Sequence, residues 1–361
     1  MSRPTPLRDV HEALGATLTD FAGWLMPLRY GSESAEHKAV REAAGLFDLS
    51  HMGEIFLTGP QAGEALDYAL VGHLSALAPG RARYTMIVDE RGGVLDDLIV
   101  YRLADEEFMV VANASNSDKV ADELKNRTKS YDATVDDRSQ QYALIAIQGP
   151  KAQEILATLT DADLDGLKYY AGLPGVVDGR QALIARTGYT GEDGFELFVA
   201  NQDAVPLWRA LEAAGEPHGL RAAGLSSRDT LRLEAGMPLY GNELSSDLTP
   251  FDAGLGRVVK FDKPGDFVGR AALEAVKDDQ PRRRLVGLVA QGRRVPRHGY
   301  PVTRDGAVVG EVTSGAPSQT LGKPIAMAYV DAGADTGLAV DIRGSHEPMD
   351  LVELPFYRRN K

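Results

Sequence analysis

A strand, the dipeptide Gly-Pro and a helix follow one another twice in this chain, and this repeat constrains the fold more than any other feature. Residues 57–67 and 147–157 match at five of eleven aligned positions, as Gly, Pro, Ala, Glu and Leu. A match of this extent is more than turn chemistry alone requires. We therefore predict two related units, each a strand–Gly-Pro–helix followed by antiparallel strands.

The segments that follow each Gly-Pro helix have the composition of strands. In the first unit they read "ARYTMIV", "GVLDDLIVYRL" and "EEFMVVAN", and the turn "DERGG" predicts a hairpin between the first two. In the second unit they read "QALIART" and "FELFVA", and we interpret the glycine-rich "GYTGEDG" between them as a tight connection between strands. Helices are expected at "PLRDVHEAL", "SAEHKAVREAAGLF", "AVPLWRALEAAG" and "SSRDTLRLEAG".

From about residue 282 the pattern changes to many short strands separated by turns rich in Gly and Asp. Close spacing of short strands is typical of a sandwich or barrel. The predicted fold class is therefore α+β, with two related antiparallel α+β units and an all-β C-terminal barrel or jelly-roll domain.

Composition excludes several classes of protein. The 361 residues are 43% hydrophobic and contain no apolar run of 18 residues, so a membrane span is not expected. The absence of cysteine excludes disulfides, thiolate metal sites and cysteine nucleophiles, and it weakly favours the cytoplasm. A net charge of −13 argues against a general nucleic-acid-binding protein.

Common catalytic motifs are also missing. The seven histidines form no HxH or HxxxH pair, so no metal is expected. "GAPSQTLGKP" has the wrong spacing for a phosphate-binding P-loop, and "GYTGEDG" lacks the helix that a dinucleotide fingerprint requires. There is no GxSxG nucleophile motif.

Two adjacent aspartates interrupt the apolar strand "GGVLDDLIVYRL". Successive side chains of a strand point to opposite faces, so Asp96 and Asp97 face opposite ways. Both faces are otherwise apolar, and a buried carboxylate needs partners or a raised pKa. We expect one aspartate to be functional and the other to stabilise the turn at Gly92-Gly93 through a backbone N–H or an arginine.

Other polar residues also stand in apolar surroundings. We place Glu196, in "GFELF", on the strand of the second unit that is comparable to the aspartate strand. Each such residue alone is more often structural than functional. Together they could line a cleft between the units that suits a flat ligand with polar edges. The remaining members of this set are Tyr84, Asn113, Tyr189 and Arg228.

Six long motifs carry a family resemblance. "TLTDFAGWLMPLRYGS", "AGLFDLSHMGE", "GGVLDDLIVY", "RTGYTGEDGFEL", "RDTLRLEAGMPLYGNEL" and "GEVTSGAPSQTLGKPIAMAYV" closely resemble the aminomethyltransferase of the glycine cleavage system, the T-protein. The likeness extends over nearly the whole chain.

The resemblance implies a cloverleaf of three domains around a central tetrahydrofolate site. The expected domains are residues 1–50 with 140–245, residues 51–139, and residues 246–361. The implied reaction transfers the methylene carbon from the aminomethylated lipoyl arm of H-protein to tetrahydrofolate, giving 5,10-methylenetetrahydrofolate and ammonia. No metal, nucleic acid or membrane takes part.

The resemblance also assigns roles to individual residues. Asp97 matches the catalytic carboxylate beside the folate nitrogens. Glu196 and Tyr189 match pterin contacts, and Arg228 and Arg358 match arginines near the folate tail and the entrance. The rest of the pocket wall is expected from Met52, Tyr84 and Asn113.

The chain departs from the family at one place beside this site. Ser226 and Ser227 stand where the family usually has Gly-Ala before the arginine, and we expect altered packing or added hydrogen bonds near Arg228.

Two alternatives remain on this scaffold. A folate-dependent demethylase would share the pocket and not the lipoyl partner. A folate-binding accessory protein of iron–sulfur maintenance would carry a cysteine motif that this chain lacks.

Overall fold

The computed structural model describes residues 2–279 and 282–359. The chain forms two compact units, which are described separately. The first unit contains residues 1–87, 96–228 and 263–267, and the second contains residues 88–95, 229–262 and 268–361. Among the described residues, no helix is long and apolar enough to cross a membrane. The predicted domain boundaries within the first unit stay a prediction.

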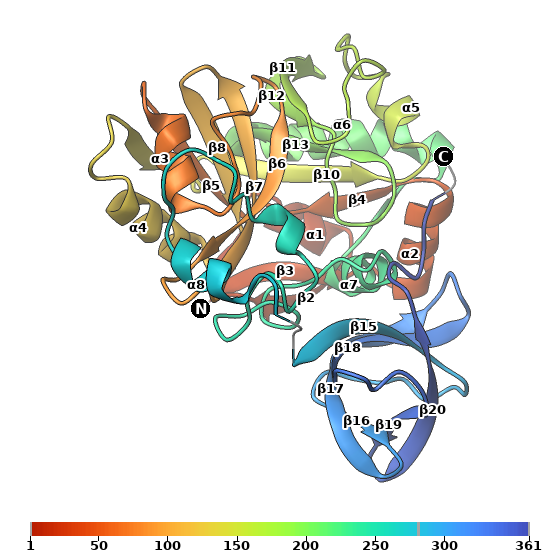
Figure 1. Ribbon diagram of the computed structural model, residues 1–361. Coiled ribbons are helices and arrows are strands. Elements are labelled where there is room, and N and C mark those ends of the chain that lie inside the picture. The colour runs from red at the N-terminus through yellow and green to blue at the C-terminus, as the bar shows by residue number, and fades with distance from the viewer. Residues whose placement is uncertain (1, 280–281, 360–361) are drawn as a thin grey trace. The chain divides into compact units, whose positions relative to one another are not determined.

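The first unit contains a five-stranded sheet that carries the two aspartates (Figure 1). Its strands, in spatial order, are β6 (Ala82–Val88), β7 (Val94–Ala104), β8 (Glu107–Ala112), β5 (Gly53–Thr58) and β9 (Thr134–Asp137). Helices α3 (Ala62–Ala69) and α4 (Ser117–Arg127) pack against β8 and β5. The "DERGG" turn joins β6 to β7, as predicted, and Asp89 accepts from the Gly93 N–H at 2.9 Å.

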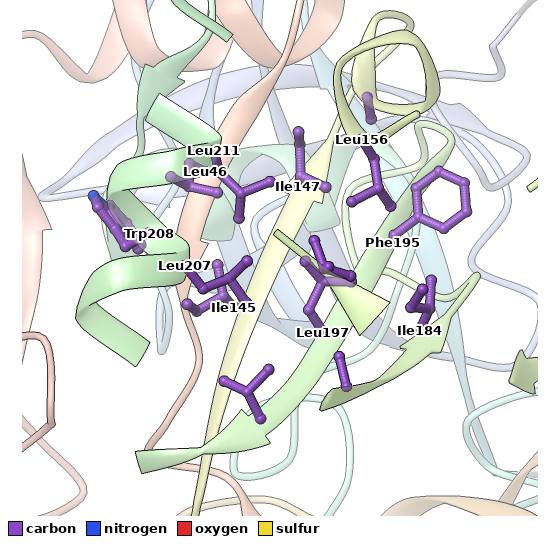
Figure 2. Close-up of a cluster of buried hydrophobic side chains, with 14 of the residues drawn as sticks. Leu46, Ile145, Ile147, Leu156, Ile184, Phe195, Leu197, Leu207, Trp208 and Leu211 are labelled. Carbon is purple, nitrogen blue, oxygen red and sulfur yellow. The ribbon is translucent and has the colours of Figure 1, made fainter. Parts of the chain in front are cut away.

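The second sheet of this unit has six strands. In spatial order they are β11 (Gly172–Val177), β12 (Arg180–Ala185), β13 (Gly194–Ala200), β10 (Tyr142–Gln148), β4 (Gly45–Asp48) and β14 (Arg221–Ala222). Helices α5 (Ala152–Leu156) and α6 (Ala204–Gly215) cover one face, and the short helices η1 (Asn201–Asp203) and η2 (Glu216–His218) flank α6. Figure 2 shows the resulting core, in which Ile145, Ile147 and Leu197 meet Leu207, Trp208 and Leu211 of α6.

The two sheets share the order of four strands, which confirms the predicted relation between the units. The order β6-β7-β8-β5 corresponds strand for strand to β11-β12-β13-β10. The strand next to β5 is β9, which follows its unit in the chain, whereas the strand next to β10 is β4, which precedes its unit. Gly59 and Gly149 both have a positive φ, of 128° and 135°, and a Cβ would lie 2.6 Å and 2.5 Å from a backbone oxygen. Glycine is therefore required at both turns.

The uncovered faces of the two sheets meet in an inner layer. Tyr101 of β7 packs edge-on against Phe198 of β13, with ring centroids 5.7 Å apart. Phe56 of β5 stacks on Tyr142 of β10 at 5.6 Å. Side chains that point into this layer from either sheet can therefore act on a common ligand.

The N-terminal segment differs from its prediction in two ways. Helix α1 (Arg8–Ala13) forms as expected, but α2 (Glu33–Glu42) ends before the last residues of the predicted helix, and Gly45 begins the buried strand β4 instead. β4 pairs with β10, about a hundred residues away, so tertiary pairing overrides the local helical pattern. A three-stranded sheet of β1 (Arg3–Pro4), β3 (Trp24–Arg29) and β2 (Thr17–Phe21) was not predicted.

The second unit confirms the predicted C-terminal barrel. Its closed barrel runs in the order β15 (Arg283–Ala290), β18 (Lys323–Asp331), β17 (Ala307–Ser318), β16 (Pro301–Arg304), β19 (Leu338–Ile342) and β20 (Ser345–Val352). Short helices η3 (Gly256–Val258) and α8 (Arg270–Val276) precede it. Helix α7 (Leu225–Glu234) begins in the first unit and ends in the second.

Candidate functional site

Asp97 lies on the inner face of the first sheet, where two neighbours hold its half-buried carboxylate. On β7 it shares a face with Tyr101, which reaches the second sheet. Tyr84 of β6 donates to Asp97 Oδ2 at 3.0 Å, and the Asn113 amide donates to Oδ1 at 2.8 Å. The structure therefore brings together three of the predicted site residues.

Asp96 is fully buried on the other face, and its partners differ from the prediction. It accepts from the Asn113 backbone N–H at 3.0 Å, from the Asn113 amide at 2.9 Å and from the Asn116 amide at 2.8 Å. The expected bond to the Gly92-Gly93 turn is wrong, because Asp89 accepts from Gly93 instead. Burial and, next, the charge of Asp97 raise the pKa of Asp96 to about 7 against these hydrogen bonds.

Asn113 ties the two aspartates together despite their opposite faces. Its amide nitrogen reaches Oδ1 of Asp96, Oδ1 of Asp97 and the Asp97 carbonyl, at 2.9, 2.8 and 3.1 Å. Asn113 follows the last residue of β8, where the strand ends and its side chain can reach around the neighbouring strand. The two carboxylates are thus coupled through one amide, which strand alternation alone did not predict.

Glu196 lies on the inner face of the second sheet and is only 8% exposed. Thr187 donates to its Oε2, Tyr101 shares a 2.8 Å hydrogen bond with Thr187, and no described residue donates to Oε1. Burial raises the pKa of Glu196, while Thr187 and Arg228 oppose the rise. One edge of this carboxylate therefore remains for a ligand.

The prediction that Glu196 and Asp97 occupy comparable strands is wrong. Aligning Gly59 with Gly149 and following the strand registers relates Glu196 to Met109 of β8. The same alignment relates Asp97 of β7 to Gln181 of β12. The two carboxylates therefore occupy positions that the repeat does not relate.

Arg228 and Tyr189 form a pair beside Glu196. The guanidinium carbon of Arg228, in the first turn of α7, lies 4.9 Å from the Tyr189 ring centroid. Burial lowers the pKa of Arg228, and the charge of Glu196 opposes this. Next to it, Ser227 is fully buried and donates to the Gly224 carbonyl at 2.9 Å and to Glu36 at 3.5 Å. The departure from Gly-Ala thus adds hydrogen bonds near Arg228, as predicted.

The remaining two predicted residues have different positions. Met52 directly precedes β5, whose first residue Gly53 pairs with Ala112, so the register places Met52 beside Asn113. Arg358 is exposed in the segment after β20 and belongs to the second unit. The group of residues assembled in the first unit does not include Arg358, and its role stays a prediction.

Two residues of this region were missed from the sequence. Tyr170 has a φ of 56°, a left-handed backbone that is uncommon outside glycine. Burial raises the pKa of Tyr170, and the charges of Tyr169, Glu196 and Asp97 raise it further. His51 is buried with an unpartnered Nδ1, and burial and then Arg228 lower its pKa to about 4. Their aromatic type was visible in the sequence, but their neighbours were not.

These groups form a partly buried, polar surface on both sides of the inner layer. Asp97 can accept or return a proton, and Glu196 can accept from N–H groups of a flat ring. Tyr84, Tyr189 and Arg228 can bind its faces and edges. Among the described residues, no group of three or more His, Asp or Glu side chains could hold a metal ion.

Comparison with known proteins gives one consistent result. Residues 7–263 match the GCVT N-terminal domain family, and residues 283–358 match the glycine cleavage T-protein C-terminal barrel domain. The chain is 68% identical to the aminomethyltransferase of Streptomyces coelicolor, over 99% of this chain and 98% of that protein. It is 44% identical to the aminomethyltransferase of Bacillus subtilis, over 99% and 100%.

A solved structure agrees with this result. The glycine cleavage system aminomethyltransferase T from Bartonella henselae matches with a TM-score of 0.93 at 37% identity, covering 100% of both chains. The chain therefore belongs to the family of glycine cleavage T-proteins, and its activity is that of an aminomethyltransferase of the glycine cleavage system.

Proposed function

We propose that tetrahydrofolate binds in the inner layer between the two large sheets and accepts carbon from the aminomethylated lipoyl arm of H-protein. The carbon–sulfur and carbon–nitrogen bonds of the aminomethyl group break, and two bonds form from this carbon to folate nitrogens. The two protons lost by those nitrogens leave with the dihydrolipoyl sulfur and with ammonia. The reaction therefore requires a group that handles protons beside the folate nitrogens.

The observation that carries this proposal is the position of Asp97. Its half-buried carboxylate faces the inner layer, and hydrogen bonds from Tyr84 and Asn113 fix its orientation. A carboxylate fixed in this way can take a proton from a folate nitrogen and deliver it to the leaving amine. It can also stabilise an iminium-like carbon through its charge.

Glu196 supplies the proposed recognition of the pterin ring. The amino-pyrimidine edge of a pterin presents N–H donors, and the Oε1 edge of Glu196 has no described donor of its own. Charge-assisted hydrogen bonds of this kind are stronger than neutral ones. Tyr189 and Met52 would pack on the ring, and Arg228 and Arg358 would meet its carboxylate-bearing tail.

The H-protein partner gives a role to part of a basic segment, residues 282–297, which contains six arginines. Of its arginines, Arg283 and Arg284 form ion pairs with Asp331 and Asp335 of the same unit. Three others, in the connection between β15 and β16, are exposed: Arg293, Arg294 and Arg297. A basic surface of this kind would steer an acidic protein or a polyglutamate tail.

A reconstituted assay tests the function. Purified chain, aminomethylated H-protein and tetrahydrofolate should give 5,10-methylenetetrahydrofolate and ammonia in equal amounts. Activity with a methylated small molecule and none with H-protein would instead support a folate-dependent demethylase.

The basic surface is tested by replacing Arg293, Arg294 and Arg297 with Gln. At low salt the KM for H-protein or for polyglutamylated folate should rise, and unchanged values for both would exclude the docking role. The predicted compartment remains the cytoplasm.

A further inference from the structure

The pairing of Arg228 with Tyr189 depends on two segments that lie far apart in the sequence. Arg228 is in the first turn of α7, and Tyr189 is in the connection between β12 and β13. A cation–π contact needs the cation within about 6 Å of the ring centroid, and here the distance is 4.9 Å. Both segments must therefore be held in place for the pair to persist without a ligand.

Glu36 of helix α2 holds the start of α7. Its Oε1 accepts from the Tyr30 backbone N–H at 2.7 Å, and its Oε2 accepts from the Gly224 N–H at 2.9 Å. A carboxylate beside the first N–H groups of a helix also balances the positive end of the helix dipole. Gly224 approaches the Leu28 backbone so closely that a Cβ there would lie 2.4 Å from the Leu28 carbonyl oxygen, so only glycine fits at this position.

Arg41, near the other end of α2, holds the segment that carries Tyr189. Its Nη1 donates to the Thr190 carbonyl at 2.7 Å and to Glu192 Oε1 at 2.8 Å. The two side chains of this ion pair are only 8% and 5% exposed, so water screens it little. Gln148 adds a second anchor, because Thr190 donates to its Oε1 at 3.0 Å and its Nε2 donates to the Thr187 carbonyl at 3.0 Å.

We propose that helix α2 is the positioning element of the Arg228–Tyr189 pair, with Glu36 and Arg41 as positioning residues. One helix thus fixes both partners of the pair, each through a buried charge of opposite sign. Tetrahydrofolate then meets a preformed contact and does not lose affinity to ordering it. This inference rests on the proposed function for its binding readout, and it needs no contact between α2 and the ligand.

A double-mutant cycle tests the positioning role. Glu36→Gln should weaken tetrahydrofolate binding about five- to tenfold in an equilibrium titration. In an Arg228→Met background, the same change should alter the affinity less than about twofold, because the residue that Glu36 positions is gone. Equal losses in both backgrounds would overturn the proposal and leave Glu36 with a general role in folding. Arg41→Lys should behave in the same way against Tyr189→Leu.

The helix also provides a matched control. Glu42 forms an exposed ion pair with Lys38 at 3.7 Å, with side chains 65% and 68% exposed. Glu42→Gln makes the same chemical change on the same helix and should leave folate affinity unchanged. If Glu36→Gln fails to fold, Arg41→Lys and Ser227→Ala test the two ends of the helix separately.

A measurement without ligand separates this proposal from the proposed function. The Tyr189 ring should shift the NMR signal of the Arg228 side-chain N–H upfield, and comparison with Tyr189→Leu measures that shift. Glu36→Gln and Arg41→Lys should each reduce it, whereas Glu42→Gln should not. An unchanged shift in both variants overturns the positioning role. Failure of the wild-type protein to bind tetrahydrofolate would instead overturn the proposed function.

Discussion

The two large sheets share the order of four strands and yet present their carboxylates differently. In the first sheet Asp97 is half-buried and receives hydrogen bonds from Tyr84 and Asn113. In the second sheet Glu196 is almost fully buried, receives one hydrogen bond from Thr187 and lies near the charge of Arg228. The repeat relates neither carboxylate to the other, because their counterparts are Gln181 and Met109.

This asymmetry distinguishes the backbone arrangement, which the two sheets share, from the functional side chains, which they do not. The repeated Gly-Pro turn, strand order and helix positions build two similar walls around an inner layer. A symmetric ligand site would place equal groups on both walls, whereas a pterin has one hydrogen-bonding edge and reactive nitrogens elsewhere. Each wall can therefore take one task, proton handling at Asp97 and recognition at Glu196.

Asp97→Asn should produce the largest effect. The amide keeps the shape of the carboxylate but cannot accept a proton, so kcat should fall by roughly 10²–10⁴-fold. The thermal midpoint should stay equal or rise, because a half-buried charge is removed. Activity with H-protein and thermal unfolding should be measured on the same preparation.

The same experiment can contradict the assignment of the two aspartates. An active and destabilised Asp97→Asn, alongside an inactive and stable Asp96→Asn, would mean that the functional carboxylate is Asp96. Tyr84→Phe offers a graded comparison, because it removes only the 3.0 Å bond to Asp97 and should cost less activity than loss of the carboxylate.

Glu196→Gln should act on binding more than on turnover. The variant loses the charge-assisted bonds to the pterin edge, so tetrahydrofolate affinity should fall by about 1.5–3 kcal/mol. Met109→Leu at the repeat-related position is the matched control, and it should leave affinity unchanged. An affinity of Glu196→Gln equal to that of wild type in a binding titration would remove Glu196 from the proposed site.

Glu54 makes the stability of the first sheet depend on pH at a position where the second sheet has no ionisable residue. Its carboxylate is buried, both oxygens lack a partner among the described residues, and its repeat-related counterpart is the apolar Leu144. Burial, with a smaller contribution from Asp137, raises the pKa of Glu54 well above its ordinary value.

The pH dependence follows from this direction. Because its folded pKa is raised, Glu54 stays neutral to a higher pH in the folded state than in the unfolded state, where it ionises near pH 4.5. Its contribution to stability is full below that pH and is lost as pH rises toward the folded pKa, by up to about 1.4 kcal/mol per pH unit. Glu54→Leu should remove this dependence and raise the free energy of unfolding at pH 7. Parallel stability–pH curves for wild type and Glu54→Leu in denaturant titrations would contradict this prediction.

Local sequence patterns predicted the elements that are determined by residues within the same short segment. The Gly-Pro turns follow from a backbone conformation that requires glycine, and the strand alternation of "VLDDLIVY" separates Asp96 from Asp97. The barrel follows from its closely spaced short strands. For the same reason, helix α6 was predicted with its observed ends, because its apolar positions recur at helical spacing.

Elements that form only through contacts with segments far apart in the sequence were missed. Strand β4 forms because β10 and β14 flank it, and no pattern within Gly45–Asp48 reveals those partners. The counterpart of Glu196 depends on strand register, which periodicity does not supply. Tyr170 has a left-handed backbone, and its carbonyl accepts from the Ala82 N–H of β6 at 2.9 Å; neither feature has a sequence signal of its own.

The smallest expected effect concerns Asp96, whose partner the sequence did not reveal. Its Oδ2 accepts from the Asn113 backbone N–H, and an amide nitrogen at that place in Asp96→Asn would leave the N–H unpaired. The variant should therefore lose about 1 kcal/mol of unfolding free energy at low pH, while its activity stays close to that of wild type.

The size of this stability deficit should depend on pH. The folded pKa of Asp96 is raised to about 7, so the wild-type protein itself loses stability as pH rises from about 4 through 7, and the uncharged Asn variant does not. At up to about 1.4 kcal/mol per pH unit, the deficit should thus be present near pH 4, disappear within about one pH unit, and reverse in sign toward pH 8 in denaturant titrations. A deficit that grows over this range would show that the Asp96 carboxylate is ionised at low pH and that Asn113 and Asn116 outweigh its burial.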